Sequence, residues 1–265
     1  MEEKTKVLRP VVLSKRLSCV AQMVSPGGTV CDVGCDHGFV AIYLIQKGIA
    51  DRVLAMDVRE GPLSRAQEHV WEYGLCDYIE VRLSDGLSAV SHKESIGTVI
   101  MAGMGGLLMT RLIDDALQRD IVMPELVLQP QSHWQQLRCF LRQQCYKIVQ
   151  EDMICEEGKY YPVLRAIRIE ERREASKEVL VAEGRSGAMR EQGDPKRAGL
   201  QREVADLFGP LLLQEKNDVL LHYLLREQDK FSLVRARIAE NGKMDEAVEK
   251  QLAMIHEALA HYESS

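Results

Sequence analysis

Acidic side chains and glycines alternate where an apolar run gives way to a turn, in Asp32-Val33-Gly34-Cys35-Asp36-His37-Gly38. Glycines at a turn that opens a helix leave backbone amides free to meet a ligand. The dinucleotide fingerprint G-x-G-x-x-G fails here, because Asp36 stands where the middle glycine would approach a pyrophosphate. Carboxylates at this turn would repel a pyrophosphate and tolerate a methionyl ammonium or a sulfonium. A dehydrogenase is therefore the least favoured class.

Acidic residues also end the next two apolar runs, as Asp57 and Asp85. Asp57 is placed to accept the two hydroxyls of a ribose, with a simple strand-end cap as the alternative. Asp85 is placed to accept an adenine amino group, and Gly86 beside it would let the backbone come close. Together with Asp32, these acids at consecutive strand ends predict a site for S-adenosylmethionine as cofactor.

A glycine-rich turn, Gly103-Met104-Gly105-Gly106, follows a fourth apolar run. A strand–helix turn needs one such glycine but not three, so we expect this backbone to form the floor of the cofactor pocket. Gln129 follows the fifth run, and its amide oxygen could bind the Watson–Crick edge of an extruded base. His37 opens a helix beside the pocket, where a structural role and a catalytic role are equally supported.

The elements that must position these residues alternate between strand and helix up to about residue 170. The expected strands are 30–33, 51–57, 78–83, 98–102 and 126–128, and the expected helices are 15–24, 39–47, 62–73, 107–119 and 132–144. Residues 146–149 and 160–169 look like a closing antiparallel pair. The alternation predicts an α/β fold, a doubly wound Rossmann-like sheet with an antiparallel edge strand. This combination is common in S-adenosylmethionine-dependent methyltransferases.

The composition changes after the sheet and divides the chain into three parts. Residues 1–170 form the expected methyltransferase domain. Residues 171–208 are expected as a linker or surface excursion, because 183–203 is charged, contains glycines and has few large apolar side chains. Residues 209–265 are predicted to form a helical coiled-coil hairpin broken at Asn241-Gly242. The hairpin could equally be a stabilising appendage or a binding arm. Its apolar seam comprises Leu213, Leu220, Leu224, Phe231, Val234, Ile238, Val248, Leu252, Ile255, Leu259 and Tyr262.

Bulk properties exclude several classes. The formal net charge is −6, which counts only weakly against RNA because local basic patches bind it. Seven scattered cysteines predict reduced thiols, and Cys31-x3-Cys35 lacks a second ligand pair, so no metal site is expected. No apolar run reaches the ~18 residues of a membrane span. Residues 1–6 contain no apolar stretch, so no secretory signal is expected. A cytoplasmic monomer with no membrane contact and no protein partner is expected.

Seven motifs, taken in order, resemble the bacterial tRNA (adenine-22-N1)-methyltransferases, class I methyltransferases with a C-terminal coiled-coil hairpin. They are Leu13-Ser14-Lys15-Arg16-Leu17, Asp32-Val33-Gly34-Cys35-Asp36-His37, Asp85-Gly86-Leu87, Met101-Ala102-Gly103-Met104-Gly105-Gly106, Leu128-Gln129-Pro130, Glu157-Gly158-Lys159-Tyr160-Tyr161 and Phe208-Gly209-Pro210-Leu211-Leu212. The resemblance implies methyl transfer from S-adenosylmethionine to adenine N1 in tRNA. It implies that the cofactor is contacted by Asp32, Gly34, Asp57 and Asp85, with the Gly103–Gly106 turn beside them. It also implies that His37, Gln129 and Arg16 are candidates to face the base or the RNA.

Methylation of adenine N1 needs little base chemistry, since a neutral ring nitrogen is the nucleophile. Catalysis is expected to rest on positioning and desolvation, with Asp36 or Gln129 as an acceptor near the adenine N6. The base must be unpaired or extruded. RNA phosphates are expected to meet basic side chains at Lys4, Lys6, Lys15, Arg16, Arg138 and Arg142.

Two other classes of function remain open. One is a methyltransferase that acts on a small molecule or a protein, which would show no RNA-dependent turnover. The other is a cofactor-binding but inactive RNA-binding or scaffold protein, whose cellular role would survive loss of cofactor binding.

Overall fold

The computed structural model describes residues 10–169, 195–240 and 243–263. Its contacts divide these residues into two compact units. The first unit joins 10–133 with 148–167, and it contains most of the sheet. The second joins 134–147 with the described residues from 168 onward.

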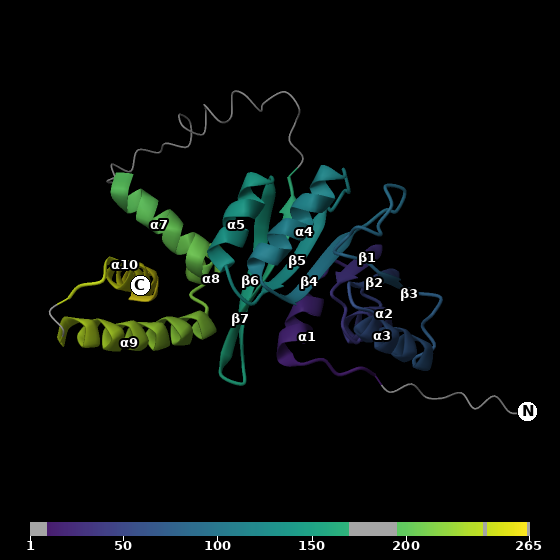
Figure 1. The fold of residues 1–265 in the computed structure, drawn as a ribbon, viewed down its shortest axis with the longest axis horizontal. Coiled ribbons are helices and arrows are strands. Elements are labelled where there is room, and N and C mark those ends of the chain that lie inside the picture. Colours follow the sequence, from purple (N-terminus) through teal and green to yellow (C-terminus); the bar gives the residue numbers. More distant parts are fainter. Residues whose placement is uncertain (1–9, 170–194, 241–242, 264–265) are drawn as a thin grey trace, which may run out of the picture. The chain divides into compact units, whose positions relative to one another are not determined.

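Seven strands form one sheet in the order β3-β2-β1-β4-β5-β7-β6 (Figure 1). They are β1 (Thr29–Val33), β2 (Arg52–Asp57), β3 (Ile79–Leu83), β4 (Thr98–Met104), β5 (Glu125–Pro130), β6 (Tyr146–Glu156) and β7 (Lys159–Arg168). The first five strands pair in parallel, whereas β7 runs antiparallel to β5. The predicted Rossmann-like sheet with an antiparallel edge is confirmed. The strand order reverses between β1 and β4, and open α/β sheets bind ligands at such a point.

Five helices belong to the segments that alternate with these strands. They are α1 (Lys15–Gln22), α2 (Phe39–Gln46), α3 (Glu60–Glu72), α4 (Gly106–Gln118) and α5 (Trp134–Gln143). The central strands are continuous apolar runs and are buried on both faces, as the fully buried Val30 and Ala55 illustrate. Gly38 precedes α2 with φ +73°, and a Cβ there would lie 3.2 Å from Ala66 Cβ. The turn between β1 and α2 therefore requires a glycine at this position.

The described residues of the second unit are mostly helical, apart from Tyr146, Lys147 and Arg168, which belong to the sheet. Besides α5 it contains α7 (Pro195–Phe208), α8 (Pro210–Gln214), α9 (Asp218–Glu240) and α10 (Glu246–Glu263). Helices α9 and α10 pack together, with Leu220 and Leu224 buried on one and Leu252 and Ile255 on the other. The base of this hairpin also contacts α7 and α8, whereas Val234 near the far end is 37% exposed. The predicted seam is thus buried at one end only, because the far end has a single partner helix.

The predicted linker is wrong over residues 195–208, which form helix α7. Val204 and Phe208 are buried, so a few apolar side chains at helical spacing hold this segment. The remainder of the predicted linker, 171–194, lies outside the described residues, as do Lys4 and Lys6. Among the residues that are described, no helix combines the length and the apolar character needed to cross a membrane.

Candidate active site

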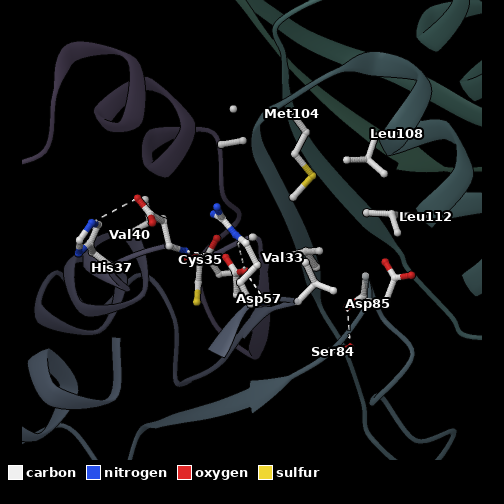
Figure 2. Close-up of a pocket in the computed structure, with 18 of the residues that line it drawn as sticks. Val33, Cys35, His37, Val40, Asp57, Ser84, Asp85, Met104, Leu108 and Leu112 are labelled. Carbon is white, nitrogen blue, oxygen red and sulfur yellow. Dashed lines mark hydrogen bonds and ion pairs between the residues drawn. The ribbon is translucent and has the colours of Figure 1, made fainter. Parts of the chain in front are cut away.

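A cavity of about 680 Å³ lies at the carboxyl ends of β1, β2, β3 and β4, beside the point where the strand order reverses (Figure 2). This volume suits one ligand of drug or cofactor size. The lining brings together most of the predicted site residues: Arg16, Asp32, Gly34, Asp36, His37, Asp57, Asp85, Gly86, Gly103 and Met104. Figure 2 shows Asp57 in the middle of the view, between His37 and Asp85.

Asp32 is the most deeply placed acid of the cavity, with 4% of its surface exposed. Its Oδ2 atom is buried and has no hydrogen-bond partner among the described residues. Burial and the nearby charge of Asp57 raise the pKa of Asp32 to about 7. A buried carboxylate oxygen without a partner is costly, so a ligand that brings a cationic or N–H donor would be stabilised here.

Asp57 is also buried, at the last position of β2. Its Oδ1 accepts a hydrogen bond from the backbone N–H of Arg59 at 2.9 Å, and its Oδ2 accepts one from the backbone N–H of Asp36 at 3.4 Å. The two bonds orient the carboxylate, and each oxygen keeps a lone pair for a further donor. Two hydroxyls of a ribose would match this arrangement.

Asp85 is exposed at the rim and belongs to an ion pair. Arg111 Nη2 of α4 lies 3.1 Å from Asp85 Oδ1, and Arg111 also contacts Asp115 at 3.1 Å. Gly86, next to it, has φ +60°, and a Cβ there would lie 2.6 Å from Leu112 Cδ2. Gly86 is therefore needed for its backbone conformation and for packing against α4.

The glycines of the turn at 103–106 have two roles, since one lines the cavity and the last two allow close packing. Gly103 lies in an irregularity of β4 with φ +75° and lines the cavity. Gly105 and Gly106 do not belong to the lining, which corrects the placement of Gly105 in the cofactor site. A Cβ on Gly106 would lie 2.6 Å from the carbonyl oxygen of Ser132, so the last glycines serve the close packing of two backbone turns.

Met104 extends from the end of β4 into the cavity (Figure 2). Its Cε lies only 2.3 Å from the position that a Cβ on Gly34 would occupy. Gly34 itself has φ +77°. The turn after β1 therefore depends on glycine both for its backbone conformation and for the room that Met104 takes.

His37 lies at the opposite side of the cavity from Asp85 (Figure 2), and Asp36, which precedes it in the chain, also lines the cavity. Asp36 is exposed, has φ +49°, and its Oδ2 lies 3.6 Å from His37 Nε2. The His37 ring lies 6.0 Å from the ring of Phe39 and 5.9 Å from that of His69. A carboxylate and aromatic rings together at a cavity rim can contact the edge and the face of a base.

Gln129 does not face the cavity, which contradicts its predicted role as a direct contact to the base. Its side chain is fully buried at the end of β5. Its Oε1 accepts from Arg16 Nη1 at 2.7 Å and from Gly103 N at 3.0 Å. The acceptor expected to bind the base is therefore used inside the protein. Gln131, two residues further on, lines the cavity instead.

The predicted RNA-binding residues separate into two groups. Lys15 is exposed on α1, and Arg16 lines the cavity. Arg138 is only 2% exposed, and its Nη1 donates to the carbonyl oxygens of Asp206 and Leu207 near the end of α7. A phosphate contact by Arg138 is therefore wrong, because α7 covers it. The remaining member, Arg142, is half exposed.

Arg142 forms a two-point ion pair with a carboxylate of its own unit. Its Nη1 lies 2.6 Å from Asp206 Oδ1, and its Nη2 lies 2.9 Å from Asp206 Oδ2. This bidentate geometry largely neutralises the charge that a phosphate would meet. The structure therefore gives Arg142 a structural role, and an RNA contact finds no support in its geometry.

The cysteines near the cavity are poor nucleophiles. Cys35 belongs to the lining, and burial together with Asp32 and Asp57 raises the pKa of its thiol far above the usual range. Within the described residues, no group of three or more His, Cys, Asp or Glu could hold a metal ion. The chemistry of the donor set is that of carboxylates, amides and backbone, which fits an adenosine that carries a cationic side chain.

Comparisons with known proteins agree with this chemistry. A protein-family model described as "Methyltransferase domain" matches residues 13–164. A Bacillus subtilis tRNA (adenine(22)-N(1))-methyltransferase is 29% identical over 240 residues, which covers 90% of each chain.

Solved structures resemble the chain over nearly all of its length. The crystal structure of the B. subtilis m1A22 tRNA methyltransferase gives a TM-score of 0.71 at 26% identity and covers 96% of this chain and 98% of that one. A Streptococcus pneumoniae protein solved in complex with S-adenosyl-L-methionine gives a TM-score of 0.74 at 27% identity and covers 94% and 100%. Each likeness thus includes the C-terminal helices as well as the sheet.

Proposed function

Because the chain belongs to the methyltransferase-domain family, as a class I S-adenosylmethionine-dependent methyltransferase, we propose that it transfers a methyl group from S-adenosylmethionine to N1 of adenine 22 in tRNA. The observation that carries the proposal is one cavity lined by an acid at each of three strand ends, Asp32, Asp57 and Asp85. The relative of known substrate matches this chain across the sheet and the C-terminal helices. The cytoplasm, where tRNA is found, is the proposed location, and the monomer is the proposed form.

Different residues of this cavity bind different groups of the cofactor. Asp57 accepts from the ribose hydroxyls, and Asp85 accepts from the adenine amino group. The partnerless Oδ2 of Asp32 accepts from the methionyl ammonium, directly or through a water. When bound, S-adenosylmethionine supplies an electrophilic methyl group on a sulfonium. Gly103 and Met104 line that end of the cavity and would limit the access of water to the bound cofactor.

The substrate side of the cavity needs an acceptor rather than a strong base. Adenine N1 attacks with its own lone pair, and the positive charge that develops spreads to the N6 amino group. Asp36 carries an exposed carboxylate on the cavity rim and is the described group best placed to accept from N6. Its Oδ2, beside His37 Nε2, can hold the N6 proton if the product becomes neutral.

The test is methylation of an unmodified tRNA transcript with labelled S-adenosylmethionine, followed by nucleoside analysis. We expect 1-methyladenosine with the intact transcript and none when adenine 22 is replaced by guanine. Asp57→Ala should abolish both labelling and cofactor binding, whereas Asp51→Asn at the opposite end of β2 should leave both unchanged. Absence of 1-methyladenosine from every tRNA tested would reject the proposal. Methyl transfer to a small molecule or to a protein would then be the function to test.

A further inference from the structure

Three arginines line the cavity, and two of them face carboxylates. Arg59 Nε lies 3.7 Å from Asp57 Oδ1, and Arg111 Nη2 lies 3.1 Å from Asp85 Oδ1. Arg16 is the third, and in the described part of the chain no carboxylate lies within ion-pair distance of it. Its positive charge is therefore the one that the lining leaves without an acidic partner.

Arg16 is nevertheless held firmly, by neutral groups. Its Nη1 donates to Gln129 Oε1 at 2.7 Å, and its Cζ lies 5.4 Å from the centre of the Tyr161 ring. A guanidinium has five N–H donors, and the described residues show a hydrogen bond for one of them. A charged group that is oriented without being neutralised is suited to bind an anion.

Gln129 connects Arg16 to the floor of the cavity. Its single amide oxygen accepts from Arg16 Nη1 and from the backbone N–H of Gly103, and its Nε2 donates to the carbonyl oxygen of Pro130 at 3.3 Å. Because Gln129 is fully buried, water cannot replace these bonds when the side chain is shortened. Gly103 brings its backbone close, since a Cβ there would lie 3.7 Å from Arg16 Nη1.

We propose that Arg16 is an oxyanion-binding residue of this cavity and that buried Gln129 is the positioning residue that aims it. The inference rests on the proposed function only for the source of the oxyanion. That function brings two oxyanions to the cavity, the methionyl carboxylate of the cofactor and a phosphate of the target nucleotide. Both offer the planar or tetrahedral oxygens that a guanidinium fork binds.

The adenine ring is a poorer partner for Arg16 than either oxyanion. An arginine only donates hydrogen bonds, so it cannot accept from the adenine N6 amino group. Its positive charge would also oppose the charge that develops on the ring during N1 methylation. The chemistry of the guanidinium therefore favours an anion at this position.

Two affinities, measured without turnover, test the proposal. Calorimetry gives the Kd of S-adenosylmethionine and of 5′-methylthioadenosine, which lacks the amino-acid carboxylate, and filter binding gives the Kd of tRNA over a range of salt. The variants are Arg16→Met, Arg16→Lys, Gln129→Met and Gln129→Glu, the last of which keeps an acceptor. Arg52→Gln is the matched loss of one positive charge, because Arg52 pairs with Glu80 at the start of β2. Thermal unfolding establishes which variants fold, and Arg16→Gln, which also removes the positive charge, replaces Arg16→Met if the latter does not fold.

If the oxyanion is the cofactor carboxylate, Arg16→Met weakens S-adenosylmethionine binding about tenfold or more and leaves methylthioadenosine binding unchanged. If it is a phosphate, tRNA binding weakens instead and its salt slope falls by about 1. Either result supports the proposal. Unchanged affinity for both ligands overturns it, whether or not the chain methylates tRNA. A chain that binds both ligands but makes no 1-methyladenosine would reject the proposed function alone.

The positioning role of Gln129 has its own readout. Gln129→Met should weaken the same ligand as Arg16→Met and add little in the double variant, because both remove one interaction. Gln129→Glu should not restore the affinity, because a carboxylate beside Arg16 Nη1 would neutralise the charge that binds the oxyanion. Losses that add fully, or a Gln129→Met effect on the other ligand, would show that Gln129 does not act through Arg16.

Discussion

The backbone N–H of Asp36 donates a hydrogen bond to Oδ2 of Asp57 over 3.4 Å. This bond joins the acid at the end of β2, which is suited to a ribose, to the exposed acid on the rim of the same cavity. Asp36 has φ +49°, a conformation that is uncommon for residues other than glycine. The proposed cofactor side and the proposed substrate side of the site are thus connected through one strained turn.

Replacing Asp36 by Asn tests its assignment to the substrate side. The amide is neutral, so it stabilises developing positive charge near N6 less well than a carboxylate does. We expect kcat for tRNA methylation to fall roughly 100-fold, while the Kd of S-adenosylmethionine changes less than about twofold. Single-turnover kinetics and calorimetry measure the two quantities. A large loss of cofactor affinity with unchanged kcat would move Asp36 to the cofactor side.

Asp32 predicts a pH dependence of stability. Its folded-state pKa of about 7 lies above its ordinary value of 3.8, so between these pH values the folded protein binds a proton that the unfolded chain has released. The contribution of Asp32 to stability is therefore present at low pH, is lost as the pH rises towards about 7, and is constant above that.

Asp32→Asn removes this titration. The Tm of the variant, minus that of the wild type, should rise between pH 5 and pH 7.5 in the absence of cofactor. Calorimetry at several pH values measures this difference in Tm. Taking the difference cancels the contributions of the other titrating groups, which both proteins share. A difference that does not change with pH would show that Asp32 is not held protonated.

Arg138 and Arg142 make a matched pair for stability, since both contact the end of α7. Arg138→Met leaves a buried and a partly buried carbonyl oxygen without their charged donor, and we expect a loss of about 2–3 kcal/mol. Arg142→Gln breaks a half-exposed ion pair and should cost less than about 1 kcal/mol. Urea unfolding followed by the fluorescence of Trp134, in a Trp71→Phe background, reports on this unit. Neither variant should change the salt slope of tRNA binding, and a lower slope in Arg138→Met would restore its predicted role at the RNA.

Gly106 should tolerate no side chain. A Cβ there would lie 2.6 Å from the carbonyl oxygen of Ser132 and 2.7 Å from that of His133, and backbone atoms cannot move aside cheaply. We expect Gly106→Ala to destabilise the protein by about 1–3 kcal/mol. Gly61→Ala in α3 is the control, because nothing lies within 4 Å of its Cβ position, and alanine favours a helix there. Equal unfolding midpoints for the two variants would contradict the packing described for Gly106.

The strands and the gathering of three acids at one cavity could be predicted from local sequence. Continuous apolar runs of strand length, most of them followed by an acid or a glycine, indicate buried parallel strands, and parallel strands bring their carboxyl ends to one edge. Asp32, Asp57 and Asp85 meet at one cavity for this reason. The helix α7 was missed because composition averaged over a charged segment hides two apolar residues at helical spacing, Val204 and Phe208.

The direction and the covering of individual side chains were decided only by the tertiary structure. Gln129 and Gln131 look alike in the sequence, yet one is buried under Arg16, 113 residues away along the chain, and the other lines the cavity. The sequence of α5 predicts an RNA contact by its basic residues Arg138 and Arg142. In the structure, α7, more than sixty residues later in the chain, covers Arg138. Residue types and the spacing of the apolar runs determine at which edge of the sheet the functional side chains gather. Contacts between distant segments determine which side chains on that edge remain free to perform it.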